Sequence, residues 1–234
     1  MARPEGLEPP AYWFEASRSI RLSYGRVALI VSFHQESRVT GPIETEVKIP
    51  FPAGARDAVL RIEDQGYRLL SPRTLESDQV FDRADQALRR GGQLLRLRSA
   101  GGRWTLTYKG PALKDPAALY KSREEIETNF SSSEALVLIL QRLGYTPSWR
   151  YEKYRTAFGS MLDPAGGGSG TIFVDETPIG VFLELEGAED WIDRTALRLG
   201  FGPKDYVTLS YASLYQAHLR SHTGPPDMIF PDPI

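Results

Sequence analysis

Short runs in which apolar and charged residues alternate recur through the middle of the chain. Alternation with a period of two is typical of strands that present two unlike faces. It predicts eight strands, at residues 43–51, 79–82, 94–99, 104–108, 123–129, 150–158, 170–175 and 180–187. The Ala100-Gly101-Gly102 sequence between the third and fourth runs is typical of a hairpin turn.

Helical spacing of apolar residues occurs between these strands, at residues 55–65, 132–143, 189–199 and 205–220. Gly66, Gly144 and Gly200 are typical stops for the first three helices, and the serine cluster at 131–133 can cap the second. Many strands with few intervening helices favour a mainly β fold that also contains α-helices. We expect a closed or strongly curved antiparallel sheet with the helices outside it.

The two ends of the chain lack this pattern. Residues 1–42 carry scattered prolines, and residues 2–26 resemble a peptide that recurs at the start of unrelated bacterial proteins, where it looks like translated non-coding DNA. The segment 221–234 is rich in proline, and residues 164–170 form a Gly-rich loop. We expect both ends to be disordered, residues 1–42 to be an extension outside the fold, and residues 43–220 to form one domain.

Composition excludes several kinds of protein. The formal net charge of the 234 residues is -2, so no global field attracts nucleic acid or an anionic membrane, and an anion site must be a local cluster of Lys and Arg. The chain has no cysteine, which excludes disulfides, thiolate zinc sites and cysteine nucleophiles. The longest apolar run, residues 27–33, is too short to span a bilayer, and no secretory signal is visible. We expect a cytoplasmic protein, with a homodimer left open.

One face of the predicted strands carries almost only Glu, Lys and Arg. Because residues i and i+2 share a face of a strand, Glu44, Glu46 and Lys48 point one way while Val47 and Ile49 point the other. The same spacing groups Arg96 with Arg98, Lys109 with Thr105 and Thr107, Arg123 with Glu125 and Glu127, Lys153 with Arg155, and Glu184 with Glu186. One interpretation is an open sheet with a wet face, whose charges pair in solvent.

A second interpretation follows from the separation of these charges by sign. Acidic residues lie on the first and last strands, and basic residues on the middle ones. If the sheet closes with this face inward, it forms a polar tunnel whose ionised groups need counter-ions, since burying each one costs on the order of several kcal/mol. A polyanion with divalent cations would satisfy both signs. Carboxylate ligands suit Mg²⁺ or Mn²⁺, and Arg and Lys suit phosphate oxygens.

Seven short motifs follow one another in the order found in a known family. They are Glu44-Thr45-Glu46-Val47-Lys48, Phe81-Asp82, Leu95-Arg96-Leu97-Arg98, Tyr108-Lys109-Gly110-Pro111, Ser122-Arg123-Glu124-Glu125-Ile126-Glu127, Glu152-Lys153-Tyr154-Arg155, and Phe173-Val174-Asp175 with Gly180, Phe182, Glu184 and Glu186. This set, over roughly residues 43–219, resembles the CYTH superfamily, or triphosphate tunnel metalloenzymes, and most closely its bacterial cyclase-type branch. The family contains class IV adenylyl cyclases, thiamine triphosphatases and inorganic triphosphatases. The resemblance implies an eight-stranded antiparallel β-barrel that forms a tunnel, with helices packed outside.

The resemblance also implies roles for individual residues. Glu44, Glu46 and Lys48 would be catalytic, with Lys48 near the reacting phosphorus or positioning the nucleophile. The phosphates would bind to Arg96, Arg98, Lys109, Arg123, Lys153 and Arg155. The metal ligands would be Glu44, Glu46, Glu125, Glu127, Asp175, Glu184 and Glu186, among which Glu125 and Glu127 would hold a second metal or orient the cations.

The chemistry implied is in-line displacement at phosphorus on ATP, thiamine triphosphate or inorganic triphosphate. A cyclase, which is a lyase, uses the ribose 3′-hydroxyl of ATP and releases pyrophosphate; a triphosphatase, which is a hydrolase, uses water. The rival is a barrel that binds polyphosphate or a nucleotide without turnover. Glu44 and Glu46 argue against that rival, because anion capture gains nothing from acids. We expect the tryptophans to pack rather than to stack on a base; these are Trp104, Trp149 and Trp191.

Overall fold

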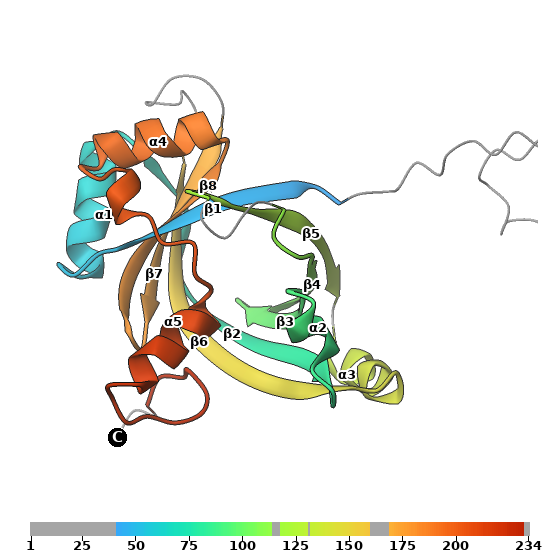
Figure 1. The fold of residues 1–234 in the computed structure, drawn as a ribbon. Coiled ribbons are helices and arrows are strands. Elements are labelled where there is room, and N and C mark those ends of the chain that lie inside the picture. Colours follow the sequence, from blue (N-terminus) through green and yellow to red (C-terminus); the bar gives the residue numbers. More distant parts are fainter. Residues whose placement is uncertain (1–40, 114–117, 131, 160–168, 232–234) are drawn as a thin grey trace, which may run out of the picture. The chain divides into compact units, whose positions relative to one another are not determined.

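The computed structural model describes residues 41–113, 118–130, 132–159 and 169–231. Within them lie eight strands and five α-helices (Figure 1). The strands are β1 (Ile43–Pro50), β2 (Arg68–Arg83), β3 (Leu94–Ala100), β4 (Arg103–Lys109), β5 (Lys121–Phe130), β6 (Tyr145–Gly159), β7 (Gly170–Thr177) and β8 (Gly180–Gly187). The helices are α1 (Ala55–Asp64), α2 (Ala87–Arg90), α3 (Glu134–Arg142), α4 (Glu189–Arg198) and α5 (Tyr211–Leu219).

The eight strands form a closed antiparallel barrel in the order β1-β5-β4-β3-β2-β6-β7-β8. Strand β1 closes it by pairing with β5 on one side, where Thr45 lies opposite Ser122, and with β8 on the other, where Val47 lies opposite Leu185. Closure confirms the predicted fold class and rejects the open sheet. Because successive side chains of each strand alternate between the two faces, one face of β1 points into the barrel and the other points away from it.

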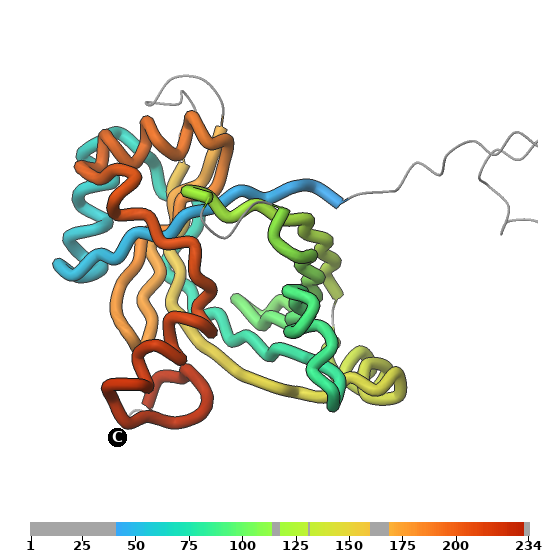
Figure 2. Tube along the Cα trace, viewed as in Figure 1, coloured from blue at the N-terminus to red at the C-terminus, as the bar shows by residue number. Residues whose placement is uncertain are grey.

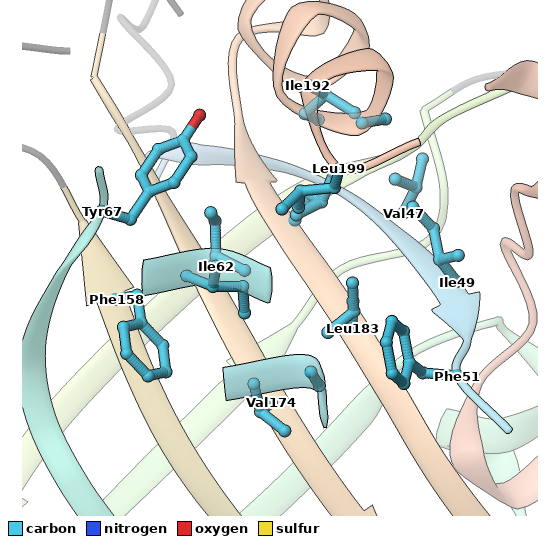
Figure 3. Close-up of a cluster of buried hydrophobic side chains, with 14 of the residues drawn as sticks. Val47, Ile49, Phe51, Ile62, Tyr67, Phe158, Val174, Leu183, Ile192 and Leu199 are labelled. Carbon is cyan, nitrogen blue, oxygen red and sulfur yellow. The ribbon is translucent and has the colours of Figure 1, made fainter. Parts of the chain in front are cut away.

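The main hydrophobic core lies outside the barrel, beneath α1 and α4 (Figure 3). Val47 and Ile49 of β1 and Leu183 of β8 are fully buried there, together with Ile62 of α1 and Ile192 of α4. The strand residues among them belong to the apolar face predicted from alternation. Burying this face under helices stabilises the barrel and leaves the opposite face to line its interior.

The predicted helix at residues 205–220 is wrong in its first half. Residues 203–205 form a 3-10 turn, and Val207 then pairs with Lys48 of β1, exchanging two backbone hydrogen bonds of 2.8 and 2.9 Å. The helix α5 begins at Tyr211, where Ser210 Oγ accepts a hydrogen bond from the backbone N–H of Ser213. Because the backbone N–H and C=O of Val207 are hydrogen-bonded to Lys48 of β1, they are not available for the hydrogen bonds of a longer helix.

Long-range pairing also lengthens two strands beyond their sequence signal. The prediction for β2 covered only residues 79–82, whereas β2 runs from Arg68 to Arg83 because it pairs along most of its length with β6.

The short helix α2 was missed. Its first turn is fixed by Asp82, whose carboxylate accepts hydrogen bonds of 3.0 Å from the backbone N–H groups of Leu88 and Arg89. The predicted serine cap of α3 is absent, since no side chain caps Ser133–Arg142 in the described residues.

The expectation of a disordered tail from Ser221 is corrected for residues 221–231. Met228 is fully buried, and its backbone exchanges hydrogen bonds with Arg150 (3.1 Å) and Glu152 (2.8 Å) of β6. The indole N–H of Trp149 donates to the carbonyl of Pro226 (3.1 Å). Proline lacks an N–H but keeps its carbonyl, so the Pro-rich segment can still dock. Figure 2 shows this segment turning back after α5.

Several expectations fall on parts of the chain outside the described residues. They concern residues 1–40, the glycine-rich stretch at 164–168 and residues 232–234. Gly41 and Pro42, expected to lie outside the fold, hydrogen-bond to Glu124 and Glu125 of β5. Among the described helices, none combines the length and apolar character needed to cross a membrane.

Candidate functional site

The interior of the barrel contains a cavity of about 310 Å³ lined mainly by charged side chains, which we call the tunnel. Alternation along each strand brings them together from distant parts of the sequence. All of the predicted site residues except Asp175 line it: Glu44, Glu46, Lys48, Arg96, Arg98, Lys109, Arg123, Glu125, Glu127, Lys153, Arg155, Glu184 and Glu186.

Most cations of the tunnel are held by carboxylates of neighbouring strands. Arg98 Nε donates to Asp78 Oδ1 at 2.8 Å, and Arg98 Nη1 lies 2.9 Å from Glu76 Oε2. Asp78 also faces Arg96, whose Nε lies 3.4 Å from Oδ1. Burial raises the pKa of Asp78, but Arg98 and Arg96 more than offset this, and the pKa lies below its ordinary value. Asp78 is therefore ionised and fixes both guanidinium groups.

Asp175 performs the same task for a second group of cations. It is fully buried and accepts from Lys153 Nζ at 2.8 Å and from both Nε and Nη2 of Arg155 at 2.7 Å. The hydroxyl of Tyr211 donates to it at 2.7 Å. Both carboxylate oxygens are thus occupied, and Asp175 lies behind the tunnel wall, where it orients Lys153 and Arg155.

Lys48 lies between two buried carboxylates. Its Nζ is 3.0 Å from Glu46 Oε1 and 2.9 Å from Glu184 Oε2. Burial lowers the pKa of Lys48, but Glu184 and Glu46 outweigh it and raise the pKa above its ordinary value. The side chain is therefore a fixed ammonium group, which can donate hydrogen bonds and stabilise negative charge but cannot accept a proton.

Three carboxylates meet at one point of the wall. One oxygen from each of Glu44, Glu46 and Glu186 lies within 4.8 Å of the others, and we call this group the acidic trio. Burial, followed by repulsion from Glu184 and Glu44, raises the pKa of Glu186 well above its ordinary value. Repulsion between crowded carboxylates is what a divalent cation relieves, and an all-oxygen donor set suits Mg²⁺ or Mn²⁺. The trio therefore fits the implied metal.

The remaining predicted metal ligands lie beside cations or hydroxyls. Glu184 contacts Arg155 (2.6 Å) as well as Lys48. Glu127 accepts a hydrogen bond from Thr107 Oγ1 (2.7 Å) and lies 3.4 Å from Arg96. Glu125 contacts Lys109, and burial together with the neighbouring Glu44 raises its pKa to about 7. These three carboxylates contact tunnel cations, and none of them belongs to the acidic trio.

Sequence reasoning missed several residues of the tunnel. Glu76 and Asp78 were missed because the predicted strand began at Gln79, and extending the alternation backward would have found both. Lys121 was missed in the same way, two residues before Arg123. Its Nζ lies 2.7 Å from Glu46 Oε1, and burial, which Glu46 only partly offsets, lowers its pKa to about 8. The tunnel residues Tyr151 and Tyr211 carried no comparable signal.

Comparison with known proteins agrees with this geometry. The model of the CYTH domain family matches residues 42–193. A curated protein of Methanocaldococcus jannaschii, named "putative adenylate cyclase", is 27% identical over 144 residues, which cover 62% of this chain and 76% of the relative. A crystal structure from Vibrio parahaemolyticus carries a similar name and superposes with a TM-score of 0.61 at 19% identity, covering 75% of this chain and 99% of that one.

A second similar structure is described by an activity as well as by a name. It is a "putative adenylyl cyclase" from Hippeastrum that is reported to have a dominant triphosphatase activity. It superposes with a TM-score of 0.54 at 15% identity, covering 75% of this chain and 95% of that one. At such identities the solved structures show the fold alone, and the family match rests on the sequence model. The chain belongs to the CYTH domain family.

Proposed function

We propose that the protein is a divalent-metal-dependent enzyme that acts on a triphosphate bound in the tunnel. The observation that carries this proposal is the convergence of the acidic trio and the Lys and Arg side chains on one cavity. Pure anion binding would gain nothing from three carboxylates beside the phosphates. Glu44, Glu46 and Glu186 would hold the metal ion, which would supply positive charge to offset the negative charge that develops on the phosphate oxygens.

The cations of the chain would bind and orient the triphosphate. Arg98 and Arg155 are pre-ordered by Asp78 and Asp175, so little conformational entropy is lost when they bind phosphate oxygens. Arg123 makes no ion pair with any described residue and faces the tunnel, which leaves its guanidinium open to a ligand. The raised pKa of Lys48 supports an electrostatic role near the reacting phosphorus rather than that of a general base.

Two reactions share this arrangement, and the names of the relatives support both. The relatives from Methanocaldococcus jannaschii and Vibrio parahaemolyticus are named for adenylate cyclase activity, whereas the Hippeastrum protein is described by triphosphatase activity. In a cyclase the ribose 3′-hydroxyl attacks the α-phosphorus of ATP and pyrophosphate leaves. In a triphosphatase water attacks the terminal phosphorus, the bond from that phosphorus to the bridging oxygen breaks, and the diphosphate leaves while the attacked phosphoryl group becomes phosphate.

An assay of three substrates tests the proposal. ATP, thiamine triphosphate and inorganic tripolyphosphate are incubated with Mg²⁺, with Mn²⁺ or with EDTA, and cyclic AMP, pyrophosphate and phosphate are measured. We expect metal-dependent release of phosphate or pyrophosphate from at least one substrate, and cyclic AMP only if the chain is a cyclase.

A matched pair of variants ties the activity to the acidic trio. Glu186→Gln removes one ligand while keeping its size, and kcat should fall by about 100-fold or more, since an outer-shell loss alone costs 10–100-fold. Glu63→Gln, an exposed residue of α1, should leave kcat unchanged. Triphosphate binding without turnover in the wild type would favour the non-catalytic barrel. Equal activity of wild type and Glu186→Gln would remove the trio from the mechanism.

A further inference from the structure

A second cavity, of about 740 Å³, adjoins the tunnel. We call it the vestibule. The two share part of their walls, so they lie side by side. The shared residues are Leu94, Lys121, Arg123, Trp149, Ser210 and Ala212. Arg98, Arg155 and Glu127 line the tunnel and not the vestibule.

The vestibule differs from the tunnel in chemistry. Its wall is largely apolar and neutral, with side chains such as Phe81, Leu209, Tyr215 and Leu219. Its acidic member, Asp82, is already bound to the backbone of α2. Its cations are Arg89 of α2, which does not line the tunnel, and Lys121 and Arg123, which mark the junction with the tunnel. A ligand that fills both cavities must therefore be anionic at one end and organic at the other.

We propose, on the basis of the function proposed above, that the substrate is an organic triphosphate whose organic group occupies the vestibule. Its phosphate chain would enter the tunnel, with the phosphate that carries the organic group held at Lys121 and Arg123. Inorganic triphosphate would leave the vestibule without a ligand group. The volume of the vestibule lies within the range typical of pockets for organic molecules.

The aromatic wall at the junction favours an organic group that contains a flat ring. Trp149 borders both cavities and is held in place by stacking on Tyr151, with ring centroids 4.8 Å apart, and by its hydrogen bond to Pro226. Stacking on a fixed aromatic side chain is a common way to bind a heteroaromatic ring. Ser148, Ser213 and Gln216 supply hydrogen-bonding groups elsewhere in the wall. In this proposal Trp149 packs, as expected from sequence, and also binds the ring.

A pair of tryptophan substitutions on α5 tests the proposal. Ser213 lines the vestibule and Ala217 lines neither cavity, and both are exposed residues of the same helix. The values of kcat/KM are measured for ATP, thiamine triphosphate and inorganic tripolyphosphate in the wild type, Ser213→Trp and Ala217→Trp. The wild type should prefer at least one organic substrate. Ser213→Trp should reduce that preference over tripolyphosphate by about 10-fold or more, whereas Ala217→Trp should retain it.

The outcomes separate this proposal from the proposed function. Metal-dependent turnover of tripolyphosphate in the wild type, without preference for either organic substrate, would overturn the vestibule assignment and leave the tunnel chemistry standing. An equal fall in kcat/KM for all substrates in Ser213→Trp would also overturn it. If the wild type neither binds nor converts any of the three triphosphates, the proposed function fails and this inference fails with it.

Discussion

Individual charged side chains in the tunnel are held by partners on neighbouring strands before any ligand arrives. Asp78 and Asp175 are fully buried, and each orients two cations. The cations themselves were predictable, because a strand of period two places Arg96 and Arg98 on one face. Asp78 was not predicted, because the predicted strand began one residue after it, at Gln79. Buried ion pairs of this kind depend on their partners, and removing one partner is costly.

The variant Asp78→Asn tests this role through the pH dependence of stability. The pKa of Asp78 in the folded protein lies below its value of 3.8 in the unfolded chain. Ionised Asp78 therefore contributes stability above that value, and the contribution is lost as the pH falls through the folded-state pKa. We expect Asp78→Asn to lower the free energy of unfolding by about 3–5 kcal/mol near pH 7. On acidification, the free energy of unfolding should then fall less in this variant than in the wild type.

Urea denaturation at neutral pH and at about pH 3 measures both effects. Asp64→Asn, at an exposed position of α1, is the control and should follow the wild type at both pH values. If Asp78→Asn loses as much stability between the two pH values as the wild type, Asp78 does not hold the guanidinium groups as an ionised carboxylate.

At the scale of elements, the sequence predicts the strands well where their two faces differ sharply. Strands β1 and β8 were predicted almost to the residue, because Val47, Ile49, Leu183 and Leu185 alternate with charged residues. The ends of β2 and β6, the start of α5 and the docking of residues 221–231 depend on pairing between distant segments. No local pattern in the Pro-rich tail shows that Met228 pairs with Tyr151.

The docking of residues 221–231 leads to a second prediction about stability. Met228 is fully buried among aromatic side chains, including Tyr151, Tyr211 and Tyr215. Met228→Ala should lower the free energy of unfolding by about 2–5 kcal/mol, because it leaves a cavity that the rigid neighbours cannot fill. The matched control is Leu197→Ala, whose side chain is 73% exposed and should change stability by less than about 0.5 kcal/mol. A loss no larger than that of the control would show that the tail is not anchored in solution.

At the scale of the whole described barrel, closure converts a striped sheet into an enclosed charged site. The order of the motifs implied this fold, and the strand pairing confirms it. The vestibule could not be predicted in the same way. Its wall combines the end of β2, α2, the first residues of β5 and α5, which contribute mostly neutral side chains without a shared motif. The sequence therefore predicted a phosphate site, whereas the site that we propose for an organic group depends on the arrangement of these segments.

The central claim is that metal and triphosphate bind together in the tunnel. Calorimetric titration of inorganic tripolyphosphate into the protein, with Mn²⁺ or with EDTA, tests it most directly. We predict that Mn²⁺ strengthens triphosphate binding in the wild type, and that triphosphate strengthens Mn²⁺ binding by the same factor, as linkage requires. Glu46→Ala should abolish this coupling while the barrel stays folded by circular dichroism. Equal triphosphate affinity with Mn²⁺ and with EDTA in the wild type would contradict the account.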